Sequence, residues 1–291
     1  MKKILLTRTR VNSHWVGDGF PVRNFFSYSD IAEHLSPFLL LDYAGPKHFP
    51  PTEKRLGVGE HPHRGFETVT IVFSGEVEHR DSTGAGGTIG PGDVQWMTAA
   101  SGIIHEEFHG REFARTGGPF EMIQLWVNLP SQFKMSPPAY QEIKAASIPT
   151  VELMDHAGSV RVIAGSHQGH AGPARTFTPM NLWEITLSAK KSARFRVTAN
   201  ETAALVLTHG TVTFSNAETL TGPALCVLEP EGEEFILDAS EDSRLLFMGG
   251  KPLNEPIVGY GPFVMNTEDE IRQAFRDYQS GKMGARLGSS S

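Results

Sequence analysis

The sequence contains only one cysteine, no long apolar run and no cluster of positive charge. Because Cys226 has no second cysteine to pair with, a disulfide bond within the chain is excluded. No apolar stretch approaches the roughly 20 residues that a membrane-spanning helix needs, so no such helix is expected. The 26 lysines and arginines are outnumbered by 33 aspartates and glutamates, which gives a formal net charge of −7. Without a basic run, direct binding of nucleic acid is not expected.

The first residues do not match a secretory signal. Two lysines and a brief apolar patch are followed at once by Arg8 and Arg10, and no small-residue cleavage site is evident. The segment is therefore predicted to be an ordinary strand. Together with the single cysteine, this pattern gives the expectation of a cytoplasmic protein.

Glycine and proline are plentiful, with 30 and 19 residues, and short apolar or β-branched runs lie between them. This rhythm is typical of an all-β protein built from sandwiches or barrels with short strands. Two β-domains of similar size are predicted. Their expected strands cover 67–73, 76–80, 93–97, 103–108 and 120–128 in the first half, and 159–164, 182–188, 192–198, 203–208, 211–215, 224–228, 234–238 and 244–248 in the second.

A polar, proline-rich stretch from Leu129 to Pro149 is predicted to connect the two domains. The predicted domain ranges are 1–140 and 141–291. The second range is expected to end in a helix at about 267–280, because a capping-box pattern at its start precedes apolar residues at helical spacing. The residues after Arg286 are expected to be mobile.

Two short motifs carry potential metal ligands. His61 and His63 are two residues apart, and so are His105 and Glu107. In an extended strand, residues two apart point to the same face, so each pair can converge on one point. Pro62 would stiffen the first pair. Three imidazoles and one carboxylate would form a mononuclear transition-metal site.

The carboxylate of this site is open between two residues. If the first motif stays extended, Glu67 shares a face with His61 and His63. Glu67 could then replace Glu107 as a ligand, or it could orient a histidine from outside the ligand set. His79 and His109 are interpreted as exposed or hydrogen-bonded strand residues.

His167 and His170 are interpreted as solvated loop residues, because glycines surround them and no carboxylate partner stands beside them. The second domain is therefore predicted to lack a metal site.

Several longer strings resemble the pirin family, and they span most of the chain, with a looser match in the second domain. They are His61–Val69, Pro91–Ala99, Gly102–Glu107, Gln124–Pro130 and Gly261–Thr267. The resemblance implies two tandem cupin (jelly-roll) barrels, of which only the N-terminal one holds a metal, usually iron. The implied ligands are His61, His63, His105 and Glu107, which favours Glu107 over Glu67.

The resemblance also implies two activities. Several bacterial pirins are similar to quercetin 2,3-dioxygenases, which open the central ring of flavonols with O2 and release carbon monoxide. Animal pirins are similar to iron-dependent redox cofactors of transcription factors, which bind a protein partner. A third alternative is a cupin enzyme with another small substrate, since a fold by itself decides none of these.

In the dioxygenase hypothesis, the metal stabilises the flavonol oxyanion and a catalytic carboxylate, Glu107 or Glu67, accepts the hydroxyl proton. Fe(II) suits the mixed nitrogen and oxygen ligands, and so do Mn, Co, Ni and Cu. An apolar pocket for a flat substrate could be lined by Phe66, Met97, Ile103 and Trp126, although each one taken alone is more typical of a barrel core.

Overall fold

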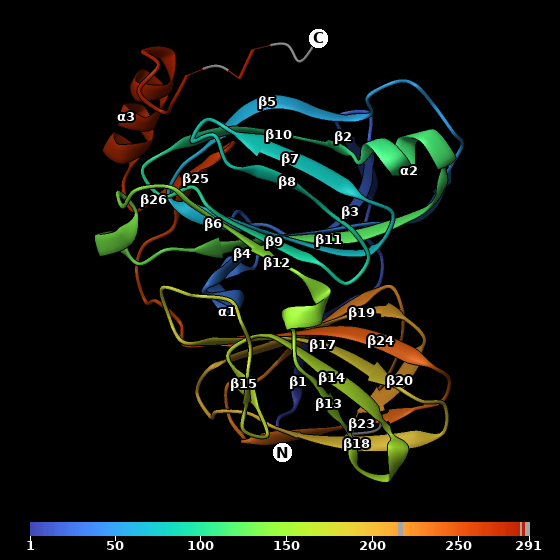
Figure 1. Ribbon diagram of the computed structural model, residues 1–291. Coiled ribbons are helices and arrows are strands. Elements are labelled where there is room, and N and C mark those ends of the chain that lie inside the picture. The colour runs from blue at the N-terminus through green and yellow to red at the C-terminus, as the bar shows by residue number, and fades with distance from the viewer. Residues whose placement is uncertain (215–217, 286, 289–291) are drawn as a thin grey trace. The chain divides into compact units, whose positions relative to one another are not determined.

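The computed structural model describes residues 1–214, 218–285 and 287–288, and it is built mainly from antiparallel β-sheets (Figure 1). The chain divides into two compact units. The unit that we call the first barrel comprises Asn12–Ala32, Phe38–Ala145 and Asn254–Ser291. The second barrel comprises Met1–Val11, Glu33–Pro37 and Ala146–Leu253.

The two ends of the chain belong to the opposite units from those expected. Strand β1 (Ile4–Arg8) pairs with β22 (Ala224–Leu228) in the second barrel, and helix α3 (Glu268–Gln279) belongs to the first. The units therefore differ from the predicted ranges 1–140 and 141–291 at both ends. The physical reason is that the local pattern reveals a strand or a helix, but not the sheet edge or apolar surface that will accept it.

The first barrel contains a seven-stranded and a four-stranded sheet, in the orders β12-β9-β6-β11-β4-β3-β2 and β5-β10-β7-β8. All five strands predicted in the first half are present. The strands are β2 (Ser13–Val16), β3 (Phe20–Phe26), β4 (Phe38–Phe49), β5 (Gly57–His63), β6 (Phe66–Ser74), β7 (Val77–Asp81), β8 (Gly86–Ile89), β9 (Val94–Thr98), β10 (Ile103–His109), β11 (Gly118–Asn128) and β12 (Ala139–Ile143), with the short helices α2 (Arg111–Thr116) and η1 (Ser131–Phe133) between them. Two further short helices, α1 (Ala32–Leu35) and η2 (Ala145–Ser147), lie where the chain passes from one unit to the other.

The second barrel repeats this plan, with sheets ordered β1-β22-β19-β24-β17-β14-β13 and β18-β23-β20-β21. The predicted strands are again present, although residue 215 of the expected strand 211–215 lies outside the described residues. The remaining elements are β13 (Thr150–Glu152), η3 (Met154–His156), β14 (Gly158–Ala164), β15 (Ser166–His167), β16 (His170–Ala171), β17 (Met180–Leu187), β18 (Lys191–Arg196), β19 (Thr202–His209), β20 (Thr211–Phe214), β21 (Thr219–Thr221), β23 (Glu234–Ala239) and β24 (Ser243–Gly250).

Large apolar side chains fill the core of the second barrel. Trp183 stacks on Phe247 with 4.6 Å between ring centroids, and Phe195 stacks on Phe235 at 5.1 Å. His167 is buried against Trp183, so the interpretation of His167 as a solvated residue is wrong, whereas His170 is exposed as expected. The segment forms a short hairpin, β15–β16, and the His167 ring packs against Trp183 and Phe195 of the barrel core, a contact that the local glycine pattern does not reveal.

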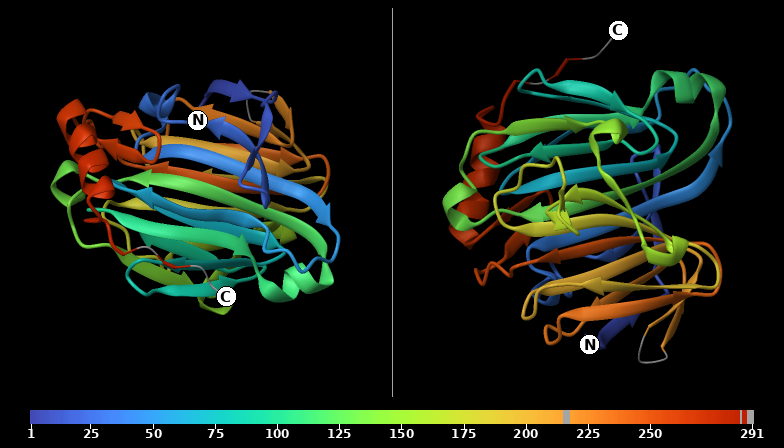
Figure 2. Two further views of the ribbon diagram at one scale, coloured as in Figure 1. Left: turned by 90° about the horizontal axis from the view of Figure 1, so that it is seen from above. Right: turned by 60° about the horizontal axis from the view of Figure 1, so that its bottom comes forward.

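The C-terminal segment completes the first barrel. Two short strands, β25 (Val258–Tyr260) and β26 (Phe263–Met265), lead into α3, and Figure 2 shows this segment beside one end of the first barrel. The predicted capping box is confirmed, because the Thr267 hydroxyl accepts from the Glu270 amide while the Glu270 carboxylate accepts from the Thr267 amide. Ile271 and Ala274 pack against Ile104 of β10. At twelve residues with one polar side, α3 lacks the length and apolar character to cross a bilayer, as do the other described helices. The end of the predicted mobile tail, 289–291, lies outside the described residues.

A buried lysine ties this segment to the strands of the first barrel. The Lys134 ammonium donates to the carbonyl oxygens of Gly65 and Val264, at 2.7 and 2.9 Å, and to Asn128 Oδ1 at 2.6 Å. Three acceptors match the three N–H bonds of an ammonium group. Burial lowers the pKa of Lys134 to about 7, and Glu255 and Glu270 partly oppose that shift. Lys134 therefore joins the bend between β5 and β6, the end of β11 and β26 through one side chain.

Replacing Lys134 by methionine is expected to lower the free energy of unfolding by about 3 kcal/mol, because three buried oxygen acceptors lose their donor. Chemical denaturation of the two proteins at pH 7 measures the difference. Lys144, half exposed and paired only at the surface, is the matched control, and Lys144→Met should cost less than about 1 kcal/mol. Equal losses of unfolding free energy in the two variants would contradict the stabilising role of the Lys134 hydrogen bonds.

Candidate metal centre

Strands β5 and β10 bring three of the predicted ligands together. The strands pair antiparallel, with His105 directly opposite His61 and Ile103 opposite His63. One ligand atom from each of His61, His63 and His105 lies within 4.8 Å of the other two. His63 and His105 are almost fully buried, and His61 is partly exposed. The alternation of the strands, which the sequence pattern used, therefore produces a histidine cluster.

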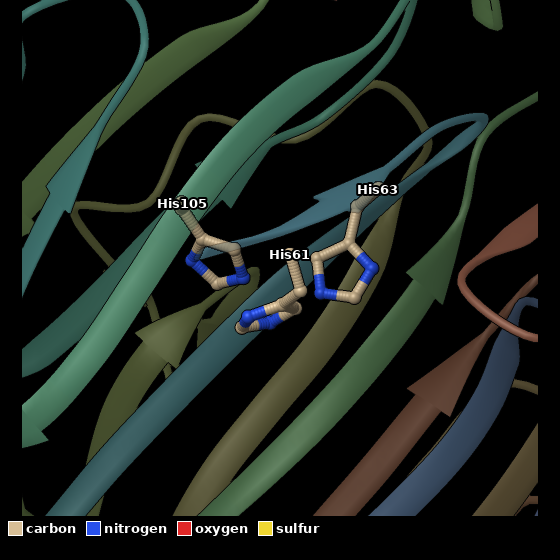
Figure 3. Close-up of side chains that lie close together, drawn as sticks. All are labelled: His61, His63 and His105. Atoms are coloured by element: carbon tan, nitrogen blue, oxygen red, sulfur yellow. The ribbon is translucent and has the colours of Figure 1, made fainter. Parts of the chain in front are cut away.

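The hydrogen bonds of two histidines fix which nitrogen is available to a metal. The Nδ1 atoms of His61 and His63 lie 2.8 and 3.4 Å from the carbonyl oxygens of Gly59 and Pro262. A carbonyl oxygen can only accept, so each Nδ1 carries the proton and each Nε2 carries a lone pair. Figure 3 shows one nitrogen of each ring turned toward the other two rings. The three rings are therefore arranged as a set of nitrogen ligands for one metal ion.

His105 shows the strongest sign of a missing partner. Its side chain is fully buried, and its Nε2 atom has no hydrogen-bond partner among the described residues. An unsatisfied buried nitrogen is uncommon, and it costs free energy unless another group fills the position. A metal ion bonded to three Nε2 atoms would satisfy it.

The electrostatics of the cluster also suit a cation. Burial first, and the neighbouring His61 second, lower the pKa values of His63 and His105 well below the ordinary histidine value. Both rings are therefore neutral at pH 7. Neutral imidazole is the form that binds metals, so no proton has to be removed from these two rings before binding.

Glu107, the predicted fourth ligand, lies beside His105 but is held by other residues. Its carboxylate accepts from Gln124 Nε2 at 2.9 Å, Gln95 Nε2 at 3.3 Å and Thr70 Oγ1 at 3.4 Å. It falls within 4.8 Å of ligand atoms of His105 and His79, in a second group that does not include His61 or His63. The register between β10 and β5 shifts between His105 and Glu107, so the two ligands do not follow a regular ladder. Three imidazoles with an adjacent carboxylate fit a divalent transition metal.

Glu67 lies on the opposite face of β6 from the side that meets Glu107. Thr70 contacts Glu107, and Glu67 must face the other way because it is an odd number of residues from Thr70. Its carboxyl accepts from Thr98 Oγ1 at 2.7 Å. The expectation that Glu67 shares a face with His63 is wrong because Gly65, at φ +91°, breaks the extended run between β5 and β6. A side chain at Gly65 would strike the Val264 carbonyl oxygen at 2.0 Å, so the bend requires glycine.

His79, which was interpreted as an ordinary strand residue, and Asp81, which was not considered, adjoin the cluster. His79 and Asp81 of β7 are buried, and the His79 ring lies next to His105. His79 and Asp81 are two residues apart, the same spacing that identified the other pairs, but nothing in the sequence shows that β7 pairs with β10. His109, also buried, donates to the Gly19 carbonyl oxygen at 2.8 Å within a ring of phenylalanines.

The predicted apolar residues occupy two separate places. Phe66 and Trp126 stack at 4.2 Å, and both rings lie next to His63, at 5.2 and 5.1 Å. Met97 and Ile103 form another small cluster with Tyr140 against it. The first pair therefore adjoins the metal cluster directly.

Family models match both barrels: the Pirin model matches residues 19–127, and the Pirin C-terminal cupin domain matches residues 182–284. The chain belongs to the pirin family. It is 55% identical to a Pseudomonas aeruginosa protein named "Putative quercetin 2,3-dioxygenase", over 97% of this chain and 98% of that protein. A pirin-like protein of Solanum lycopersicum is 39% identical over 92% of this chain and 88% of its own.

This chain is also similar to solved structures. A quercetin 2,3-dioxygenase from Acinetobacter baumannii superposes with a TM-score of 0.96 at 52% identity, covering 99% of this chain and 100% of that one. The predicted fold, two cupin barrels with a C-terminal helix, is thereby confirmed.

Glu67 should affect stability and not metal binding. Burial raises its pKa from 4.5 to about 7, so between these pH values the folded state holds a proton that the unfolded chain has lost. The free energy of unfolding therefore falls as pH rises through this window, by on the order of 3 kcal/mol. Glu67→Gln should remove that loss while metal content stays unchanged. Denaturation at pH 5 and 8 measures the pH dependence of stability, and metal analysis measures the metal content. Loss of metal from Glu67→Gln would indicate that Glu67 belongs to the metal site.

Proposed function

We propose that this pirin is a metal-dependent dioxygenase that opens the ring of flavonols such as quercetin with O2, of the quercetin 2,3-dioxygenase type. The observation that carries the proposal is the convergence of His61, His63 and His105, with an unpartnered, buried Nε2 on His105. The names of the Pseudomonas and Acinetobacter relatives support this substrate and reaction. The proposed ligands are these three histidines and Glu107. The proposed metal is Fe(II), and Mn, Co, Ni and Cu are the alternatives to be tested.

When bound, the metal would supply a Lewis acid that favours ionisation of the flavonol hydroxyl and a path for electrons to O2. The proton needs an acceptor at a defined position. Glu107 fits this role because donors from Thr70, Gln95 and Gln124 hold its carboxylate beside His105. Glu67 is not proposed for this role, because it lies on the other face of β6 from Thr70 and Glu107.

The aromatic residues beside His63 suit a flat substrate. Phe66 and Trp126 stack on each other, and Tyr28 stacks on the Trp126 ring at 6.4 Å. Aromatic rings stack well on a planar flavonol. The Trp126 indole N–H is buried without an acceptor among the described residues, and a substrate oxygen would satisfy it. Together these rings offer one wall and one hydrogen-bond donor.

The first test is metal analysis of the anaerobically purified protein, followed by quercetin in air while the visible absorbance is recorded. About one metal per chain and metal-dependent loss of the flavonol band support the proposal. Reconstitution with each candidate metal identifies the one that supports turnover. Bound metal with a stable flavonol spectrum would favour a different substrate, or a redox protein that binds a protein partner.

His105→Ala is expected to fold but to lose at least about 100-fold in metal affinity, because it removes a buried nitrogen ligand and leaves a space at the site. Quercetin turnover should fall with metal occupancy. The matched control is His170→Ala, an exposed histidine of the second barrel, which should keep both properties. Full activity in His105→Ala would contradict the proposed metal site.

A further inference from the structure

A chain of three buried side chains leads away from the metal cluster. Asp81 Oδ2 lies 3.2 Å from His79 Nε2, and His79 Nδ1 lies 3.3 Å from His105 Nδ1. None of the three side chains is more than 3% exposed. Strand pairing enforces the arrangement, since β10 pairs with β7 and places His105 directly opposite Asp81. The three groups therefore form one continuous hydrogen-bonded line.

With a metal on His105 Nε2, only one assignment of protons in neutral rings satisfies both links. If His105 Nε2 faces the metal with its lone pair, His105 Nδ1 carries the proton and needs an acceptor. The atom within reach is His79 Nδ1, which must then be unprotonated. Neutral His79 consequently carries its proton on Nε2, where the Asp81 carboxylate accepts it. Each residue's role follows from that of its neighbour.

Asp81 and His79 are themselves held in place by other residues. The second oxygen of Asp81, Oδ1, accepts from the amide and hydroxyl of Thr83, at 2.8 and 2.6 Å. The Tyr140 ring stacks on His79 with centroids 5.1 Å apart and planes 8° apart. The Tyr140 hydroxyl in turn donates to Gln95, whose amide donates to Glu107. The surroundings thus fix the plane of His79 as well as its partners.

We propose that His79 and Asp81 are positioning residues for His105, which they hold with Nε2 toward the metal and make more basic. This inference rests on the metal site of the proposed function. Metal-bound histidines commonly donate to a carboxylate, and here an extra imidazole lies between that carboxylate and the ligand. The buried carboxylate of Asp81 is thus separated from the metal by two imidazole rings, where the common arrangement has one.

A competing role for His79 is direct coordination, because His79, His105 and Glu107 also form a compact group. A metal at that position would bind His105 through Nδ1. It would leave the buried Nε2 of His105 without a partner and break the link from His79 to His105. The positioning role satisfies both nitrogens of His105 and is therefore favoured.

Two substitutions at His79 separate hydrogen bonding from packing. His79→Phe keeps an aromatic ring against Tyr140 but removes the acceptor, whereas His79→Gln loses the ring and keeps a carbonyl oxygen that can accept from His105. The affinity for Co(II) and Fe(II) is measured by competition with a chromophoric chelator, together with the visible spectrum of the Co(II) form. His79→Phe should lose about 10- to 100-fold in affinity, and His79→Gln should retain most of it.

Asp81→Asn should lose less than His79→Phe, since His79 remains as an acceptor for His105. His109→Phe is the matched control, because His109 is also a buried histidine of the first barrel but lies outside the line. It should leave metal affinity unchanged. Wild-type affinity in His79→Phe, or equal losses in the Phe and Gln variants, would overturn the positioning role. Two metals per wild-type chain, falling to one in His79→Phe, would assign His79 as a ligand instead.

These measurements do not use quercetin. Tight binding of metal by the wild type without flavonol turnover would contradict the proposed reaction while leaving the role of His79 testable. Absence of metal binding by the wild type would contradict the site itself, and with it the positioning role.

Discussion

The antiparallel pairing of β10 with its two neighbours is the constraint on which the candidate centre depends. On one side, β5 places His61 opposite His105; on the other, β7 places Asp81 opposite His105. His105 is therefore the residue at which the ligand cluster and its hydrogen-bonded support meet. A slip of one residue along either pairing would turn His105 to the other face of the sheet and separate the two sets.

The polar interior of the first barrel follows from this centre. Thr70, Gln95 and Gln124 line the inner face of the large sheet and direct their donors at Glu107. Buried polar groups are tolerated only when they are hydrogen-bonded, and here one carboxylate satisfies three of them. In the second barrel, the corresponding space holds stacked aromatic rings such as Trp183, Phe195 and Phe247. One architecture thus carries a polar interior in one copy and an apolar one in the other.

The C-terminal segment supports the same centre from outside. The Pro262 carbonyl oxygen accepts from His63, and Arg64, the residue that follows β5, pairs with Asp277 of α3 at 3.0 Å. Residues of α3 pack against Ile104, the neighbour of His105. The last part of the chain therefore steadies both ligand-bearing strands, which explains why α3 belongs to the first barrel although it follows the second in sequence.

The sequence by itself determined the strands, the capped helix and the spacing that places His61, His63 and His105 on common faces, because these depend on short-range periodicity. Its resemblance to pirins added the two-barrel fold and the choice of Glu107. Only the tertiary structure decided that Gly65 turns Glu67 away, that His79 and Asp81 stand behind His105, and that the chain ends belong to opposite barrels. Each of these depends on which strands pair, and strand pairing joins residues far apart in the chain, where local patterns carry no information.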